Sequence, residues 1–297
     1  KQVGVSWSTV QRTLSSLASM TKVKKKWLPE SLIMDEFRSL KTQTDKFSFS
    51  CMDGKTGKLV DVLPSRKKDY HVHYFMQFEQ QALLAVKSEV THMNAPYISV
   101  MKTFFPNAQL IVDRFHIIQH LNRCFDNVRK RIMNQLNPRN SEEAKIYRQL
   151  KSLNRLLIKP EQRLNYTKRK KWRNFGWNYL TETDVIERLL SSSEELRLSY
   201  SFYQELLAAF HQKDPDEFFH LLHQTPKELP DELKHIKKAF FSYESAIRLA
   251  LKLPYSNSKL ENIHTHIKVL KRVSYGFRSF KNMRTRIFLA NHLIQFS

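Results

Sequence analysis

The chain has 297 residues, of which 41% are hydrophobic, so it can bury one large core or two modest ones. Its 50 Lys and Arg against 28 Asp and Glu give a net charge of +22, which favours a polyanionic partner, most often nucleic acid. Two distant cysteines, Cys51 and Cys124, exclude a disulfide framework and a cysteine-built zinc site within this stretch, and no apolar run approaches the roughly 20 residues of a membrane span.

The first twenty residues predict a turn and a helix. Serines stand at candidate N-cap positions, and Val10, Leu14 and Leu17 follow at helical spacing. The segment resembles the second half of a helix-turn-helix, and an ordinary amphipathic helix accounts for it equally well. The opening KQVGVSWSTVQ has no initiator Met and is not a signal peptide, so we expect a piece of a longer protein that is cytoplasmic and nucleoid-associated.

Residues 31–113 predict alternating strands and helices. SLIMDEF is a short strand ending in Asp35-Glu36, residues 47–65 are a hairpin, and 71–86 are a helix. VKSEVT is a strand ending at His92, a helix begins at Pro96, and AQLIVD is a buried strand ending at Asp113. This order predicts an α/β fold with a mixed sheet.

From residue 117 to about 250 the pattern is helical throughout, with apolar stripes of period 3.6 and no strand alternation. A loop and a basic helix follow, with Glu261 in the first turn of that helix. An all-helical block of about 130 residues therefore follows the last predicted strand.

Most of the positive charge lies in two stretches. Residues 121–180 carry a net charge of +12 and residues 259–286 a net charge of +7. Aromatic residues are interleaved in both, as in KRKKWRNFGWNYL and KRVSYGFRSF, which suits a surface that follows a phosphate backbone and stacks on bases. A merely solvated basic face is the alternative.

Three acidic residues have positions that suit metal chemistry. Asp35 and Asp113 end predicted strands, and Glu261 opens a basic helix. Carboxylates at adjacent strand ends converge and repel unless a cation lies between them, and such oxygen ligands suit Mg²⁺ or Mn²⁺. Structural roles stay open: Asp35 as a cap, Glu261 as a partner of the helix dipole, and Asp113 in a local hydrogen-bonded cluster with His116.

Several long motifs, in this order, resemble the DDE transposases of bacterial insertion sequences, specifically the ISL-three group. The motifs are PESLIMDEFRSLK, MNAPYISVMKTFFPNAQLIVDRFHIIQHLNR, YLTETDV and SNSKLENIHTHIKVLKRVSYGFRSFKNMRTRI. The resemblance implies an α/β, RNase H-like mixed sheet interrupted by a large all-helical insertion before the last catalytic helix. It also implies cleavage at DNA ends and strand transfer with two Mg²⁺ or Mn²⁺ ions, with the family's N-terminal zinc module absent here.

The implied domains are a partial helix-turn-helix with a basic linker at 1–28 and the first part of the RNase H-like core at 29–120. The helical insertion then occupies 121–252, and the final helical part of the core occupies 253–297. The implied partners are double-stranded DNA at the element ends and the target, and a second copy of the chain on that DNA, with no membrane.

The resemblance implies that Asp35 is the first catalytic carboxylate and that Glu261 is the last. It also implies that both residues are metal ligands. The family's second aspartate falls on His92 in this chain. Asp113 is the fallback second carboxylate, and His116 and Asn257 are supporting residues. The glycines that usually flank the last carboxylate are Ser258 and Asn262 here.

The resemblance and the charge pattern together predict a set of DNA-binding cations: Arg123, Arg129, Lys130, Lys168, Arg169, Lys170, Lys171, Lys268, Lys271, Arg272 and Arg278. An imidazole at position 92 removes one negative charge from a site for two divalent ions and favours other metals than Mg²⁺. Two further hypotheses stay open: a decayed or repurposed transposase that only binds DNA, and an RNA-binding factor.

Overall fold

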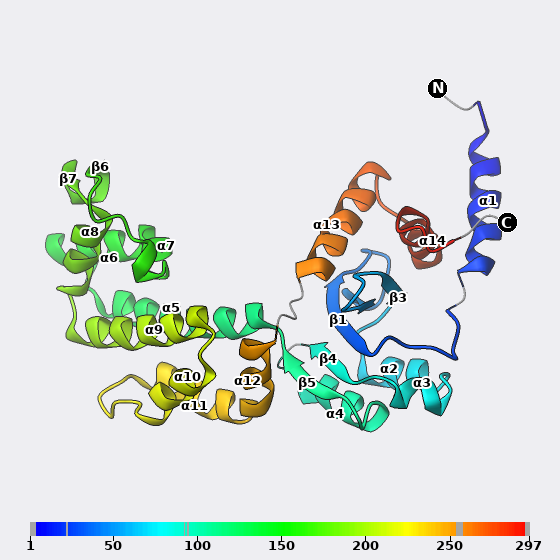
Figure 1. Cartoon of the computed structure of the whole chain (residues 1–297). Coiled ribbons are helices and arrows are strands. Elements are labelled where there is room, and N and C mark those ends of the chain that lie inside the picture. The colour runs from blue at the N-terminus through cyan, green and yellow to red at the C-terminus, as the bar shows by residue number, and fades with distance from the viewer. Residues whose placement is uncertain (1–3, 22, 92, 94, 254–257, 295–297) are drawn as a thin grey trace. The chain divides into compact units, whose positions relative to one another are not determined.

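The computed structural model describes residues 4–21, 23–91, 93, 95–253 and 258–294 (Figure 1). The chain divides into two compact units, one made of Lys1–Asp113 with Tyr255–Ser297 and the other of Arg114–Pro254. The first unit carries the sheet, and the second is mostly helical.

Within the described residues of the first unit, five strands form one mixed sheet in the order β3-β2-β1-β4-β5. The strands are β1 (Ser31–Arg38), β2 (Phe47–Asp53), β3 (Leu59–Leu63), β4 (Ser88–Thr91) and β5 (Gln109–Val112). The pairs β1–β2 and β2–β3 are antiparallel, whereas β1–β4 and β4–β5 are parallel. The predicted α/β fold with a mixed sheet is confirmed.

Helices cover both faces of this sheet (Figure 1). The helices are α2 (Lys68–Phe75), α3 (Gln80–Leu84) and α4 (Ala95–Phe104) on one face and α13 (Ser258–Val273) and α14 (Phe280–Ala290) on the other, while α1 (Trp7–Met20) packs against α14. One core cluster joins Leu32 and Met34 of β1 to residues of α2, α3 and α4, and a second joins Phe37 of β1 to residues of α13 and α14. Since side chains alternate along a strand, Asp35 shares the face of Phe37, which is the face under α13.

Two predicted boundaries in this unit are wrong. The strand that was expected to end at Asp35-Glu36 continues to Arg38, because Glu36, Phe37 and Arg38 all pair with β2. The helix expected over 71–86 is two helices, α2 and α3, separated at residues 76–79. The predicted N-cap of the first helix is confirmed, because the backbone N–H of Thr9 donates to Ser6 Oγ at 3.2 Å.

The second unit packs its helices around buried aromatic residues such as Phe125 and Tyr203, whose rings stack at 4.7 Å. The helices are α5 (Arg114–Gln135), α6 (Ser141–Ser152), α7 (Asn154–Leu157), α8 (Glu182–Leu190), α9 (Glu194–Gln212), α10 (Pro215–His223), α11 (Asp231–Phe241) and α12 (Glu244–Lys252), with short 3₁₀ turns at Glu161–Arg163 and Arg173–Phe175.

The helical block is not free of strands, contrary to expectation. β6 (Lys170–Trp172) and β7 (Asn178–Leu180) form an antiparallel hairpin. Gly176 and Trp177 turn the chain between them with φ of 66° and 61°. Three-residue strands are too short to produce a readable period of two, which is why the sequence pattern missed them.

Candidate functional site

Asp35 lies in the middle of β1 and is 7% exposed. Its Oδ1 accepts a hydrogen bond from the backbone N–H of Glu36 at 2.6 Å. Its Oδ2 lies 3.7 Å from Nδ1 of His264, a buried residue of α13. The carboxylate is therefore held on the sheet face that α13 covers.

His264 links α13 to two strands. Its Nε2 lies 2.7 Å from Oγ of Ser50 on β2, and the Ser50 hydroxyl donates to the backbone carbonyl of Asp35 at 3.2 Å. The Ser50 hydroxyl therefore contacts both His264 and the backbone of Asp35, while Nδ1 is the ring nitrogen that faces the Asp35 carboxylate. Sequence analysis did not single out His264, and its contact with Asp35 is visible only in the tertiary structure.

Glu261 stands three residues before His264, in the first turn of α13. Its pKa is raised, first by burial and then by the negative charges of Asp113 and Asp35, while Lys268 opposes the shift. The negative charges of two of the predicted carboxylates, Asp113 and Asp35, therefore contribute to the raised pKa of the third, Glu261.

Asp113 follows β5 directly and is 3% exposed. Its backbone N–H donates to the carbonyl of Thr91, the last residue of β4, at 3.0 Å. On β1, Ile33 pairs with Val90 of β4, and Asp35 lies two residues after Ile33. On β5, Val112 pairs with Thr91 of β4, and Asp113 is the next residue. The parallel register therefore brings both aspartates to the same edge of the sheet.

Two predicted site residues, His92 and Asn257, lie outside the described residues. His116 belongs to α5 in the helical unit, where its ring lies edge-on to Phe115 with centroids 5.4 Å apart. Within the residues that the structure describes, no group of three His, Cys, Asp or Glu side chains is arranged to hold a metal ion.

The predicted cations of the helical unit fall into two kinds. Arg129 is 4% exposed, and its guanidinium donates to Asp126 and to the carbonyl of Leu150, so its prediction as a DNA contact is wrong. A guanidinium turned inward to satisfy a buried carbonyl is not open to phosphate. Lys130 is exposed but paired with Asp126 at 2.7 Å.

The hairpin of β6 and β7 presents cations and aromatic rings together on the surface. Residues 168–171 are all exposed, and so are Tyr166, Trp177 and Tyr179. Lys170 lies 4.3 Å from the ring centre of Trp172, and Lys171 lies 5.3 Å from that of Tyr179. This arrangement suits a surface that meets a phosphate backbone.

Replacing Glu261 with glutamine tests the raised pKa of this carboxyl. A carboxyl with a raised pKa in the folded state favours folding below its ordinary pKa of 4.5 and loses that contribution as the pH rises through the folded value. We therefore expect Glu261→Gln to raise the thermal unfolding midpoint by about 1–2 °C at pH 8 and to have no effect below pH 4. Scanning fluorimetry across this pH range measures the difference. A variant less stable than the native chain at pH 8 contradicts the raised pKa.

Residues 32–287 match the ISL-three family of DDE proteins, which is described as "Transposase". The chain belongs to this family.

Two relatives add detail to the family match. The transposase for insertion sequence element IS1001 of Bordetella parapertussis is 24% identical over 254 residues, which are 84% of this chain and 58% of that protein. A Lactococcus lactis protein described as an ATP-dependent protease is 43% identical over 111 residues, which are 37% of this chain and 36% of that protein. The chain thus spans little more than half of the first relative, and its match to the second covers about a third of each chain.

The matched part of the Lactococcus protein is too short to carry that protein's description over to this chain.

No helix among the described residues is long and apolar enough to cross a membrane.

Proposed function

We propose that the chain is the RNase H-like catalytic part of an insertion-sequence transposase that cleaves DNA at the element ends and joins the cut strand to target DNA. The observation that carries the proposal is the parallel register that brings Asp35 and Asp113 to one edge of the sheet, while His264 of α13, the helix that bears Glu261, contacts Asp35. The negative charges of both aspartates also contribute to the raised pKa of Glu261. The strand order β3-β2-β1-β4-β5, with its antiparallel hairpin followed by parallel strands, supports the RNase H-like part of the proposal.

The donor set fits Mg²⁺ or Mn²⁺ in chemistry. Asp35 and Glu261 offer carboxylate oxygens, and Mg²⁺ is commonly bound by one or two carboxylates with water completing its shell. Burial raises the pKa of Glu261, and the negative charges of Asp113 and Asp35 raise it further, which supports a cation-binding role for these carboxylates. Two such ions, when bound, activate a water or a 3′-hydroxyl and stabilise the leaving oxygen.

The other residues of the site hold this arrangement in place. His264 and Ser50 join α13 to β1 and β2, and thereby fix Glu261 relative to Asp35. Asp113, tethered by its backbone to β4, is the fallback second carboxylate, because the family's position for the second aspartate carries His92 in this chain. We assign DNA contacts to the exposed cations of the β6–β7 hairpin and of α13, on double-stranded element ends and target, with two copies of the chain on the DNA in the bacterial nucleoid.

A second candidate function is a transposase descendant that binds DNA without cleaving it. His92 at the place of the family's second aspartate favours it, together with the exchanged residues Ser258 and Asn262 beside Glu261. The helical unit and its basic hairpin would then serve DNA binding alone.

A cleavage assay on labelled element-end DNA with Mg²⁺ or Mn²⁺ separates the two candidates. We expect nicking by the native chain, and a loss of at least about 100-fold in Asp35→Asn, which removes a charge from the metal site while keeping the size of the side chain. Lys102→Ala, an exposed change on α4, is the matched control. Nicking that Asp35→Asn leaves intact contradicts the proposal, and DNA binding without any nicking favours the second candidate.

A further inference from the structure

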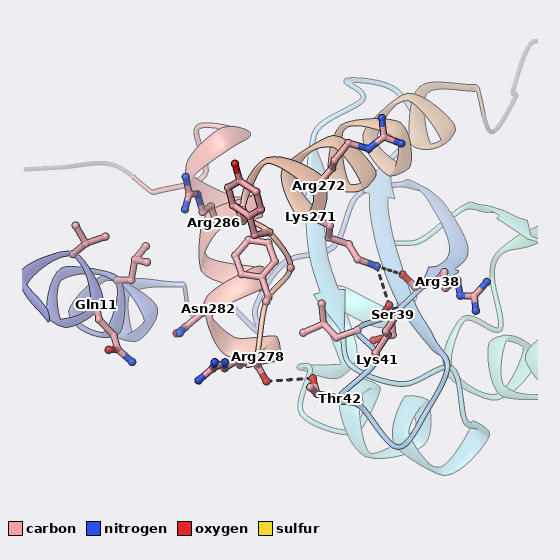
Figure 2. A pocket seen from close by; sticks show the side chains of 17 residues that line it. Gln11, Arg38, Ser39, Lys41, Thr42, Lys271, Arg272, Arg278, Asn282 and Arg286 are labelled. Carbon is pink, nitrogen blue, oxygen red and sulfur yellow. Dashed lines mark hydrogen bonds between the residues drawn. The ribbon is translucent and has the colours of Figure 1, made fainter. Parts of the chain in front are cut away.

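A large hollow lies in the sheet-bearing unit, on the side of α1 and α14 (Figure 2). Its volume is about 1500 Å³, and its walls come from α1, from the loop after β1, from the turn between α13 and α14, and from α14 itself. Sites for single small molecules span roughly 300–1,000 Å³, so this hollow has room for a length of polymer.

The walls of this hollow are strongly basic. Six cations line it, and its described lining residues include no Asp or Glu. The cations are Arg38, Lys41, Lys271, Arg272, Arg278 and Arg286, and all but Lys271 are exposed. Six positive charges around one concave surface concentrate a field that favours a polyanion.

Three hydrogen bonds fix the two sides of the hollow to each other. Lys271 Nζ donates to the backbone carbonyls of Arg38 and Ser39, each at 2.8 Å, and the Thr42 hydroxyl donates to the carbonyl of Arg278 at 3.2 Å (Figure 2). These bonds tie the loop after β1 to the turn that follows α13. The hollow is therefore formed in advance of any ligand.

An aromatic side chain at this turn is fully exposed to solvent. Tyr275 lines the hollow with a relative exposure of 101%, and its backbone has a φ of 51°, in the left-handed region. Its N–H donates to the carbonyl of Arg272, and the next residue, Gly276, closes the helix on the carbonyl of Lys271. The left-handed backbone thus serves the C-cap of α13, whereas the fully exposed ring adds nothing to the core and is open to a ligand.

We infer that this hollow binds a stretch of DNA strand containing an unpaired nucleotide, whose base stacks on Tyr275 while the cations hold the flanking phosphates. Bases within a duplex already stack on their neighbours, so only an unpaired or extruded base offers a free face to the ring. The inference rests on the proposed function, because it is that function which makes DNA the polyanion.

Fluorescence titration of the whole chain tests the inference. One labelled hairpin DNA has a fully paired stem closed by a non-nucleotide linker, and a second of the same sequence carries a single unpaired 2-aminopurine in its stem. We expect the native chain to bind the second more tightly and to quench the 2-aminopurine. Tyr275→Ala should lower affinity for that DNA by about 5- to 100-fold, abolish the quenching and leave binding of the paired hairpin unchanged.

Two further variants sharpen the result. Tyr275→Phe keeps the ring and should retain the native behaviour, whereas Arg272→Ala should reduce the salt dependence of binding to the unpaired DNA by about one phosphate contact. Tyr70→Ala, a partly exposed tyrosine of α2 outside the hollow, is the matched control and should behave like the native chain.

Equal binding of both hairpins by the native chain overturns the inference, as does an equal loss on both DNAs in Tyr275→Ala. An RNA strand that competes better than DNA overturns it too. If the native chain binds the paired hairpin but Tyr275→Ala changes nothing, only this inference fails. If the native chain binds neither hairpin, the proposed DNA function fails as well.

Discussion

Replacing His92 with aspartate is expected to raise the rate of Mg²⁺-dependent cleavage of element-end DNA by about 10²–10³-fold. The change restores the carboxylate that the family pattern has at this position, and in the proposed function it would add one negative charge to the site for two divalent cations. Metal binding would improve there, because Mg²⁺ prefers an oxygen ligand to an imidazole. Single-turnover cleavage of a labelled DNA end at saturating protein measures the rate.

Two companion variants decide which residue is the second carboxylate. Asp35→Asn in the His92→Asp background should return the rate to background, because it removes a proposed ligand. Asp113→Asn in the native chain should abolish activity if Asp113 serves as the second carboxylate. If His92→Asp changes nothing and Asp113→Asn is inactive, the family's assignment of position 92 does not apply to this chain.

Replacing Asp61 with alanine is expected to lower the free energy of unfolding by about 3–5 kcal/mol. Asp61 on β3 is 3% exposed, and its Oδ1 accepts from Nε and Nη2 of Arg284 at 2.8 and 2.6 Å. Its Oδ2 accepts from the Tyr74 hydroxyl at 2.8 Å. The alanine variant leaves a half-buried guanidinium without its carboxylate, and removing one partner of a buried pair costs more than removing both.

The same network fixes the first helix to the core. Arg284 Nη1 donates to the backbone carbonyl and the hydroxyl of Thr21, the C-cap of α1, at 2.9 and 2.7 Å. Loss of Asp61 should therefore loosen α1 and with it one wall of the basic hollow.

Urea unfolding followed by circular dichroism measures the change. The double variant Asp61→Leu with Arg284→Met should recover part of the lost stability, because no unpaired charge remains. Glu30→Ala breaks an exposed pair with Lys55 and Lys87 and should move the unfolding midpoint little. An Asp61→Ala variant as stable as Glu30→Ala contradicts the structural role of the network.

The sequence predicted secondary structure best where an element is long enough to show a periodic pattern of apolar residues. The mixed α/β layout could be predicted because strands and helices of that segment differ in period over four to ten residues each. The β6–β7 hairpin could not, because three residues per strand carry no period and its basic, aromatic composition reads the same on a helix. Arg129 was misassigned for a related reason: a positive charge count does not tell which guanidinium turns inward to a carbonyl such as that of Leu150.

The sequence by itself determined the family, through long motifs that survive in order, and the candidate carboxylates Asp35, Asp113 and Glu261. Only the tertiary structure decided what surrounds them. His264 meets Asp35 across 229 positions of sequence, Arg284 meets Asp61 across 223, and Tyr275 stands open at the edge of a hollow built from three distant segments. Such contacts depend on how strands pair and helices pack, and side-chain periodicity along one element carries no information about the element that lies against it.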